Sequence, residues 1–293
     1  MKHTSLIDAA ALAKQLESPN LALIDCRFDL AAPAAGAAAY LAGHIPGAVY
    51  AHLETDLSDR PGPGTGRHPL PSPARLAQRL GAMGVDANSQ IVAYDAANGS
   101  MAARLWWLAR WLGLRHVAVL NGGFSAWVAA GGAVQAGDAQ PRGRSFAPSI
   151  DAAAAVTTAG VMNALQDPRL RLVDARAEER YAGTVEPIDA RAGHVPGALN
   201  YPFMRNLTAD GRFHPAAELR RRWLEFLAGT RPQDVIAMCG SGVTACHNLL
   251  ALEAAGLPGA RLYAGSWSEW IADPRRAVAT GTAAGAISQR EAT

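Results

Sequence analysis

The chain has 293 residues, of which 49% are hydrophobic and 18% are charged, and its formal net charge is +2. This length predicts about two domains of ordinary size, and the balanced charge provides no basic field for nucleic acid. The N-terminal segment has no apolar signal-peptide core, and no stretch is long and apolar enough to span a membrane. Three cysteines in a chain of this length do not make a disulfide framework. We therefore expect a cytoplasmic protein with reduced thiols and no membrane partner.

The first half of the chain reads as alternating helices and short apolar strands. Helical patterns cover residues 8–17 and 73–83, and apolar strands cover 21–24 and 91–94. Three short motifs punctuate these elements: Asp25-Cys26-Arg27 after the first strand, the turn Gly43-His44-Ile45-Pro46-Gly47-Ala48, and a late turn that carries Trp127. Such alternation is typical of an α/β domain with a mainly parallel sheet flanked by helices.

The second half repeats these elements in the same order. The matching pieces are a helix at 158–166, the strand that ends in Asp174-Ala175-Arg176, the turn Gly193-His194-Val195-Pro196-Gly197-Ala198, a helix at 215–227, the strand 235–238 and the turn with Trp270. Ordered matches of this kind predict two homologous domains, over residues 1–138 and 151–293, joined by a linker at 139–150.

Features present in both halves are expected to be structural rather than catalytic. This applies to the turn histidines, to the Asp-x-Arg motifs and to the late tryptophans, that is, to His44 and His194, Asp25 and Asp174, Arg27 and Arg176, and Trp127 and Trp270. A functional site should instead lie where the two halves differ.

The halves differ at the residue that follows the central strand, which is Asp95 in the first half and Cys239 in the second. Cys239 precedes a Gly-Ser-Gly turn and a helix-compatible stretch from 244 to 255. Backbone N–H groups of such a turn can converge on the sulfur, and the positive end of the helix dipole favours a thiolate. We predict a sulfur nucleophile or sulfur carrier at Cys239, near the domain interface, and a small buried hydrophobe at Cys26 and Cys246.

Together these motifs resemble the tandem-domain rhodanese-type sulfurtransferases over essentially the whole chain. The resemblance implies two rhodanese-like domains, an inactive first one and a catalytic second one, with Cys239 cycling between thiol and persulfide. It implies no metal or organic cofactor, and the cysteines and histidines show no metal-ligand spacing. The implied partners are a small-molecule sulfur donor and, as acceptor, a thiol, a thioredoxin-like protein or cyanide.

The loop Cys239-Gly240-Ser241-Gly242-Val243-Thr244 resembles that of 3-mercaptopyruvate sulfurtransferases. Relatives that prefer thiosulfate typically carry cations at the second and third loop positions, which suits a dianion. Gly240 and Ser241 offer only N–H groups and a hydroxyl. The resemblance therefore assigns donor binding and persulfide stabilisation to the backbone of Gly240, Gly242, Val243 and Thr244.

Matching the family residue by residue implies further site residues. Arg180 falls where an arginine binds the donor carboxylate, and Arg191 is a second candidate because the family's usual second position holds Asp189. A Ser-His-Asp relay would consist of Ser241, His68 from the first domain and Asp56, which is one position off the usual register.

Other functions are weighed against this interpretation. Thiosulfate:cyanide sulfur transfer and a persulfide carrier for a sulfur-trafficking partner both remain open. A cysteine phosphatase is disfavoured because its loop needs an arginine six residues after the cysteine, where this chain has Ala245.

Overall fold

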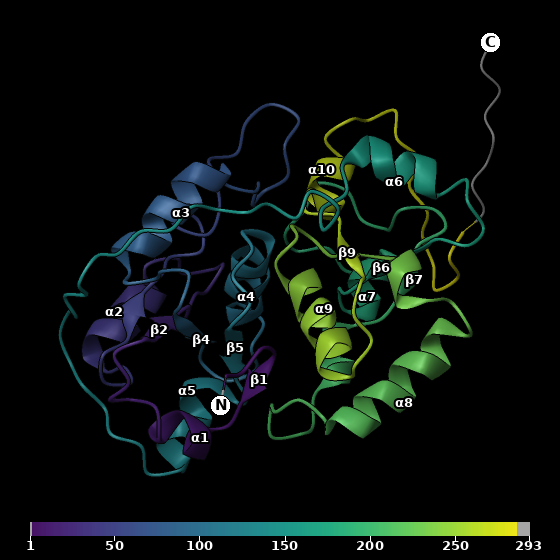
Figure 1. The fold of residues 1–293 in the computed structure, drawn as a ribbon. Coiled ribbons are helices and arrows are strands. Elements are labelled where there is room, and N and C mark those ends of the chain that lie inside the picture. Colours follow the sequence, from purple (N-terminus) through teal and green to yellow (C-terminus); the bar gives the residue numbers. More distant parts are fainter. Residues whose placement is uncertain (1, 286–293) are drawn as a thin grey trace.

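The computed structural model describes residues 2–285 and contains two similar α/β halves that lie side by side (Figure 1). The elements of the first half are β1 (Leu6–Ile7), α1 (Ala9–Ala13), β2 (Leu21–Asp25), α2 (Ala35–Ala42), β3 (Val49–Tyr50), α3 (Pro73–Ala82), β4 (Gln90–Tyr94), α4 (Ala102–Trp111), β5 (Val117–Leu120) and α5 (Gly123–Ala129). Its strands are all parallel, in the order β1-β5-β4-β2-β3.

The second half begins with α6 after a stretch without regular structure. Its elements are α6 (Thr158–Ala164), β6 (Arg171–Asp174), α7 (Glu178–Ala182), β7 (Leu199–Asn200), the 3-10 helix η1 (Phe203–Asn206), α8 (Ala216–Leu227), η2 (Pro232–Asp234), β8 (Val235–Met238), α9 (Thr244–Ala254), β9 (Arg261–Leu262) and α10 (Ser266–Trp270). Its parallel sheet has the order β7-β6-β8-β9. A parallel bridge between Ala155 and Leu262 stands where β1 pairs with β5 in the first half. The predicted fold class is thus confirmed.

The central strands are predominantly apolar because helices cover both of their faces. Every residue of β4 and of β8 is buried, as expected for strands inside a parallel sheet. Helix starts follow local capping rules: Ser72 caps α3 ahead of Pro73, and Thr157 caps α6.

The predicted linker, residues 139–150, contains no helix or strand. Its backbone is attached to the first half, since the N–H of Arg144 bonds to the carbonyl of Gly81 and the N–H of Ser149 bonds to that of Leu112. The linker therefore runs along the surface of the first half before the chain enters the second (Figure 1).

The duplicated motifs have the same structural role in each half. Arg27 pairs with Asp25 at 2.6 Å and donates to the carbonyl of Gly43 at 2.7 Å, and Arg176 does the same with Asp174 (2.7 Å) and Gly193 (2.8 Å). Each arginine therefore ties a strand end to the glycine-histidine turn. The turn histidines stack on tyrosines, His44 on Tyr40 and His194 on Tyr181.

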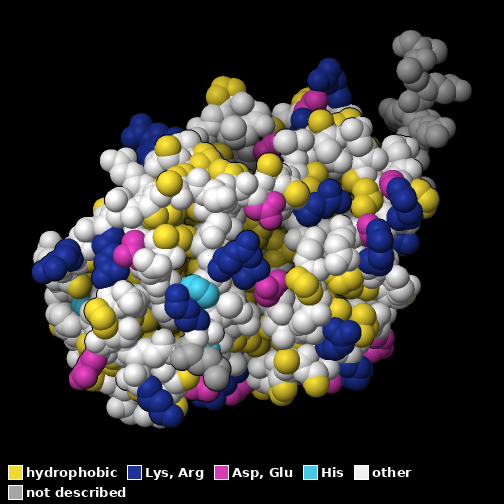
Figure 2. Space-filling model, in the orientation of Figure 1, with side chains coloured by type: hydrophobic (Ala, Val, Ile, Leu, Met, Phe, Trp, Pro, Cys, Tyr) yellow, Lys and Arg dark blue, Asp and Glu magenta, His cyan; other side chains and the backbone are white. Residues whose placement is uncertain are grey.

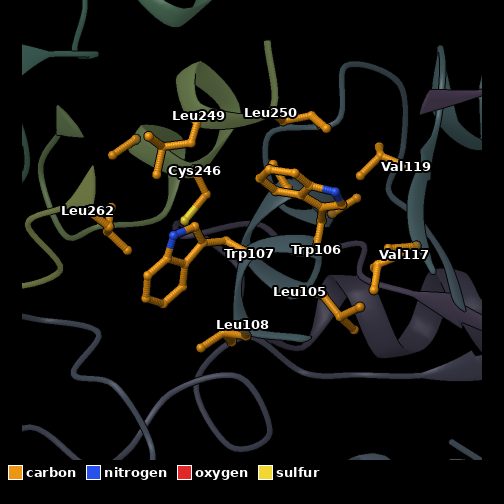
Figure 3. Close-up of a cluster of buried hydrophobic side chains, with 14 of the residues drawn as sticks. Leu105, Trp106, Trp107, Leu108, Val117, Val119, Cys246, Leu249, Leu250 and Leu262 are labelled. Atoms are coloured by element: carbon orange, nitrogen blue, oxygen red, sulfur yellow. The ribbon is translucent and has the colours of Figure 1, made fainter. Parts of the chain in front are cut away.

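One hydrophobic core is continuous across both halves, with α4 and α9 packed against each other at its centre (Figure 3). Trp106 and Trp107 of α4 share this core with Cys246, Leu249 and Leu250 of α9. Cys246 is fully buried, and burial raises the pKa of its thiol to about 12, so it remains a protonated, apolar side chain. The two halves are joined by a packed interior and not only by the linker.

Charged side chains of both signs are dispersed over the face shown in Figure 2 rather than gathered into a basic patch. Within residues 2–285, no helix is long and apolar enough to cross a membrane. No group of three or more potential metal-ligating side chains is found in the same residues.

Candidate active site

Cys239 lies at the carboxyl end of β8, directly before the loop that leads into α9. Its side chain is buried, and its sulfur accepts a hydrogen bond from the N–H of Gly242 at 3.2 Å. Its own N–H donates to Ser266 Oγ at 3.1 Å, and its carbonyl accepts from the N–H of Trp267 at 3.0 Å. The cysteine is thus fixed from both sides, by its own loop and by the start of α10.

Gly242 occupies a position where only glycine fits. Its φ is +76°, in the left-handed region, and a Cβ there would lie 2.3 Å from the carbonyl oxygen of Ala264. This conformation is what aims the Gly242 N–H at the Cys239 sulfur.

Ser241 and His68 meet across the two halves. The Nδ1 atom of His68 lies 2.7 Å from Ser241 Oγ, and both side chains are buried. Burial, followed by the charges of Arg104 and Arg67, lowers the pKa of His68 to about 3. His68 is therefore neutral near pH 7 and can orient the Ser241 hydroxyl.

The structure does not place Asp56 on His68. The carboxylate of Asp56 accepts the N–H of His52 at 2.8 Å, closing the turn that follows β3, and His68 Nε2 has no partner among the described residues. The displaced register of Asp56 explains this, because the residue caps its own turn instead of facing the histidine. The contact seen here joins two predicted members of the relay and leaves the third apart.

Arg104 of α4 is a buried cation that the sequence does not single out. It is 0% exposed and donates to the carbonyls of Gly242 (3.0 Å) and His68 (3.1 Å). No carboxylate pairs with it among the described residues, and burial lowers its pKa. The chain places this charge near the thiols of Cys239 and Cys246. Arg104 thus connects the Cys239 loop of the second half to the segment of the first half that contains His68.

Two guanidinium groups converge above Gly240, the residue after the cysteine. A Cβ built on Gly240 would lie 3.2 Å from Arg67 Nη2 and 3.5 and 3.6 Å from the two Nη atoms of Arg180. Asp189 bridges them, with one oxygen 2.5 Å from Arg67 Nη1 and the other 2.9 Å from Arg180 Nη2. Glu186 also pairs with Arg180, at 2.8 Å. The structure brings Arg180, a predicted site residue, together with Arg67, which no sequence motif singled out; the position of Arg67 next to His68 was the available signal.

Arg191 has a buried Nη1 atom without a hydrogen-bond partner among the described residues. Its carbonyl accepts the indole N–H of Trp267 at 2.9 Å, and the three atoms closest to a Cβ on Gly240 belong to Arg67 and Arg180. Val243 is buried at the end of the loop, and Thr244 is the first residue of α9.

In the first half, Asp95 occupies the place of the cysteine and fills its own loop. Its carboxylate accepts N–H bonds from Ala97 and Gly99 on one oxygen and from Met101 and Ala102 on the other, at 2.8–3.2 Å. Burial raises the pKa of Asp95, and these four donors oppose that effect. The Asp95 carboxylate therefore occupies the N–H groups of the loop before α4 that could otherwise bind another anion.

Two similar α/β halves, with one cysteine loop at their interface, define a tandem-domain protein with a single cysteine centre. The sequence profile of the rhodanese-like domain matches residues 8–130 and 157–273. The chain therefore belongs to the rhodanese family.

Relatives of this chain carry two kinds of name. A protein of Pseudomonas aeruginosa named probable 3-mercaptopyruvate sulfurtransferase is 51% identical, over 96% of this chain and 100% of its own length. Thiosulfate sulfurtransferase of Cricetulus griseus is 36% identical, over 95% and 96%. The crystal structure of SseA from Escherichia coli, described as a 3-mercaptopyruvate sulfotransferase, is 33% identical with a TM-score of 0.78, covering 91% of this chain and all of that one.

Proposed function

We propose that this protein is a sulfurtransferase that moves sulfur from 3-mercaptopyruvate, through a persulfide on Cys239, to a thiol, a thioredoxin-like protein or cyanide. The observation that carries the proposal is the guanidinium group of Arg180 above Gly240, the residue that follows Cys239. In 3-mercaptopyruvate the carbonyl carbon separates the carboxylate from the carbon that carries the thiol, so a carboxylate bound there brings the thiol sulfur toward the cysteine. The names of the relatives support the same reaction class.

The charge balance of the site favours a monoanionic donor. Arg67, Arg176 and Arg180 are matched by three carboxylates, those of Asp174, Glu186 and Asp189. The further cation at the loop, Arg104, lies near the thiols of Cys246 and Cys239. Binding there depends on directed N–H donors rather than on a strong net positive charge. Thiosulfate carries two negative charges, and the loop residues Gly240 and Ser241 supply no cation for the second.

The first step moves one sulfur atom. The Cys239 thiolate attacks the donor thiol sulfur, the new S–S bond forms, and the donor C–S bond breaks. The electron pair stays on carbon as the pyruvate enolate, which takes up a proton to give pyruvate. The Ser241 hydroxyl, oriented by neutral His68, can hydrogen-bond to the enolate oxygen as charge develops.

The second step regenerates the Cys239 thiolate. Cyanide or an acceptor thiolate attacks the outer sulfur of the persulfide, and the electrons of the S–S bond return to Cys239 as a thiolate. The three free cysteines support a reducing, cytoplasmic setting for this cycle.

The N–H groups that bind the Asp95 carboxylate in the first half indicate which N–H groups would bind a persulfide on Cys239 in the second half. Gly99 and Gly242 share a left-handed φ, and their N–H groups bond to Asp95 and Cys239 respectively. In the first half, the N–H groups of Met101 and Ala102, at the start of α4, donate to Oδ2 of Asp95. This oxygen corresponds to the outer sulfur of a persulfide. By this comparison the N–H groups of Val243 and Thr244, at the start of α9, are the donors for an outer persulfide sulfur.

Steady-state kinetics tests the donor. We expect kcat/KM for 3-mercaptopyruvate to exceed that for thiosulfate by about 100-fold, which corresponds to about 2.7 kcal/mol of transition-state binding. Cys239→Ser should abolish turnover and the persulfide mass, whereas Cys246→Ser should retain both.

Thiosulfate sulfur transfer is the second candidate function, favoured by relatives with that name. Equal or better activity with thiosulfate would establish it and overturn the donor assignment. A persulfide that forms on Cys239 but is not transferred to any small acceptor would instead indicate a carrier.

A further inference from the structure

Arg67 reaches the cysteine loop from the other half of the molecule. Its N–H donates to Ser268 Oγ at 3.0 Å, and a Cβ on the preceding Gly66 would lie 2.5 Å from the carbonyl oxygen of Gly265. The backbone of residues 66–68 therefore rests directly on the start of α10. Arg67 and His68 are consecutive, and both side chains approach the Cys239 loop.

Asp189 holds the two guanidinium groups together. Its side chain is only 4% exposed, and its two oxygens are divided between Arg67 and Arg180. Two like charges can stay this close because the carboxylate between them offsets their repulsion. Arg67 retains 27% exposure of its side chain and Arg180 retains 18%, so solvent and small molecules can reach them.

Each arginine keeps an unused donor at this place. Arg67 Nη2 and Arg180 Nη1 donate to no acceptor among residues 2–285, and they are the atoms that lie 3.2 and 3.6 Å from a Cβ on Gly240. The φ of Gly240 is not in the left-handed region, so the backbone does not demand glycine here. What the glycine provides is space between the loop and the two guanidinium groups.

We propose that Arg67 is a second donor-binding residue, contributed by the first half of the chain, which binds the carboxylate of the sulfur donor together with Arg180. Two N–H donors from two guanidinium groups match the two oxygens of one carboxylate. The identity of the donor rests on the proposed function, and the role of Arg67 toward a carboxylate rests on the geometry above. The donor site is then complete only when the two halves are joined.

Kinetics of Arg67→Gln tests this inference, with Arg75→Gln as the matched control, because Arg75 pairs with Asp59 on the exposed surface of the same half. We expect Arg67→Gln to raise KM for 3-mercaptopyruvate by about 10- to 100-fold, the usual cost of a lost hydrogen bond to a charged group. The control should match the wild type. A mercaptoketone donor, in which a methyl group replaces the carboxylate, should lose less than about threefold in kcat/KM on the Arg67→Gln change.

A charge swap provides the rescue. Arg67→Asp alone should lose more than Arg67→Gln, and Arg67→Asp combined with Asp189→Arg should recover at least about tenfold in kcat/KM, since the guanidinium then comes from position 189. Binding of pyruvate to the Cys239→Ser protein, measured by calorimetry, should weaken by the same factor when Arg67 is replaced.

The outcomes separate the inference from the proposed function. An unchanged KM and an unchanged pyruvate affinity in Arg67→Gln would overturn the inference, as would an equal loss with the mercaptoketone, which would indicate a structural role. If the wild type forms no persulfide from 3-mercaptopyruvate while pyruvate binding still depends on Arg67, the donor assignment fails and the carboxylate site stands.

Discussion

Gly242 is the residue on which the geometry of the Cys239 loop depends most directly. Its N–H is the donor to the sulfur, its φ is +76°, and the Ala264 carbonyl oxygen fills the place of a Cβ at 2.3 Å. A side chain at this position must therefore move either the loop or the strand end that carries Ala264.

We expect Gly242→Ala to lower the free energy of unfolding by about 2–4 kcal/mol, because a left-handed alanine is strained and the added carbon collides with backbone. Gly229→Ala is the matched control, since Gly229 has a φ of +89° with nothing within 4 Å of a Cβ. Its cost should be only about 1 kcal/mol. Urea unfolding measures both, and equal costs would contradict the steric argument.

The paired helices α4 and α9 are the elements that join the two halves chemically as well as mechanically. Arg104 of α4 donates to the loop before α9, and Arg110 of the same helix pairs with Glu253 of α9 at 2.9 Å. The second pair is partly exposed and contributes little to stability. The first is a buried cation without a carboxylate partner among the described residues, and the thiols of Cys246 and Cys239 lie near it. Because burial keeps Cys246 protonated, a thiolate at Cys239 is the anion left to balance this charge.

Arg104→Met should therefore slow the alkylation of Cys239. Iodoacetamide reacts with the thiolate, and we expect the rate constant near neutral pH to fall by about tenfold, because the substitution removes a buried positive charge near the cysteine. Arg110→Met should leave that rate unchanged. An unchanged rate in Arg104→Met, with a folded protein by circular dichroism, would show that the charge acts on the loop structure alone.

At the scale of the whole molecule, the stability of the contact between the two halves depends on two buried, neutral histidines. His68 of the first half meets Ser241, and His247 of α9 lies 3.0 Å from the carbonyl oxygen of Asn98 in the first half. Burial lowers the pKa of each to about 3. Protonation of either residue would place an uncompensated charge inside the interface.

Stability should therefore fall on mild acidification. Both histidines are neutral above their ordinary pKa of 6.5, and below it the unfolded chain binds protons that the folded chain does not. The free energy of unfolding should drop between about pH 6.5 and 3, by up to about 1.4 kcal/mol per pH unit for each histidine. His247→Gln should reduce that slope between pH 6.5 and 5, above the range of carboxylate titration. A slope equal to that of the wild type would exclude His247 as the cause.

The sequence by itself determined the repeated α/β architecture, the cysteine that breaks the repeat and the family. These follow from local patterns: buried strands appear as apolar runs, tight turns require glycine and proline, and an internal repeat exposes the one residue that differs. The contact of Ser241 with His68 and the approach of Arg180 to Gly240 are positions that the family resemblance anticipated and that the structure brings together.

Only the tertiary structure decided which side chains complete the site. Arg67 and Arg104 lie far from Cys239 in the chain, and their charges meet its loop because α4 packs on α9 and residues 66–68 rest on α10. Asp56 shows the reverse case, since a shift of one residue turned it into a cap for its own turn. Contacts between the two halves depend on loop lengths and on how the helices pack. Both bring together residues that are far apart in the sequence, so a local sequence pattern does not reveal them.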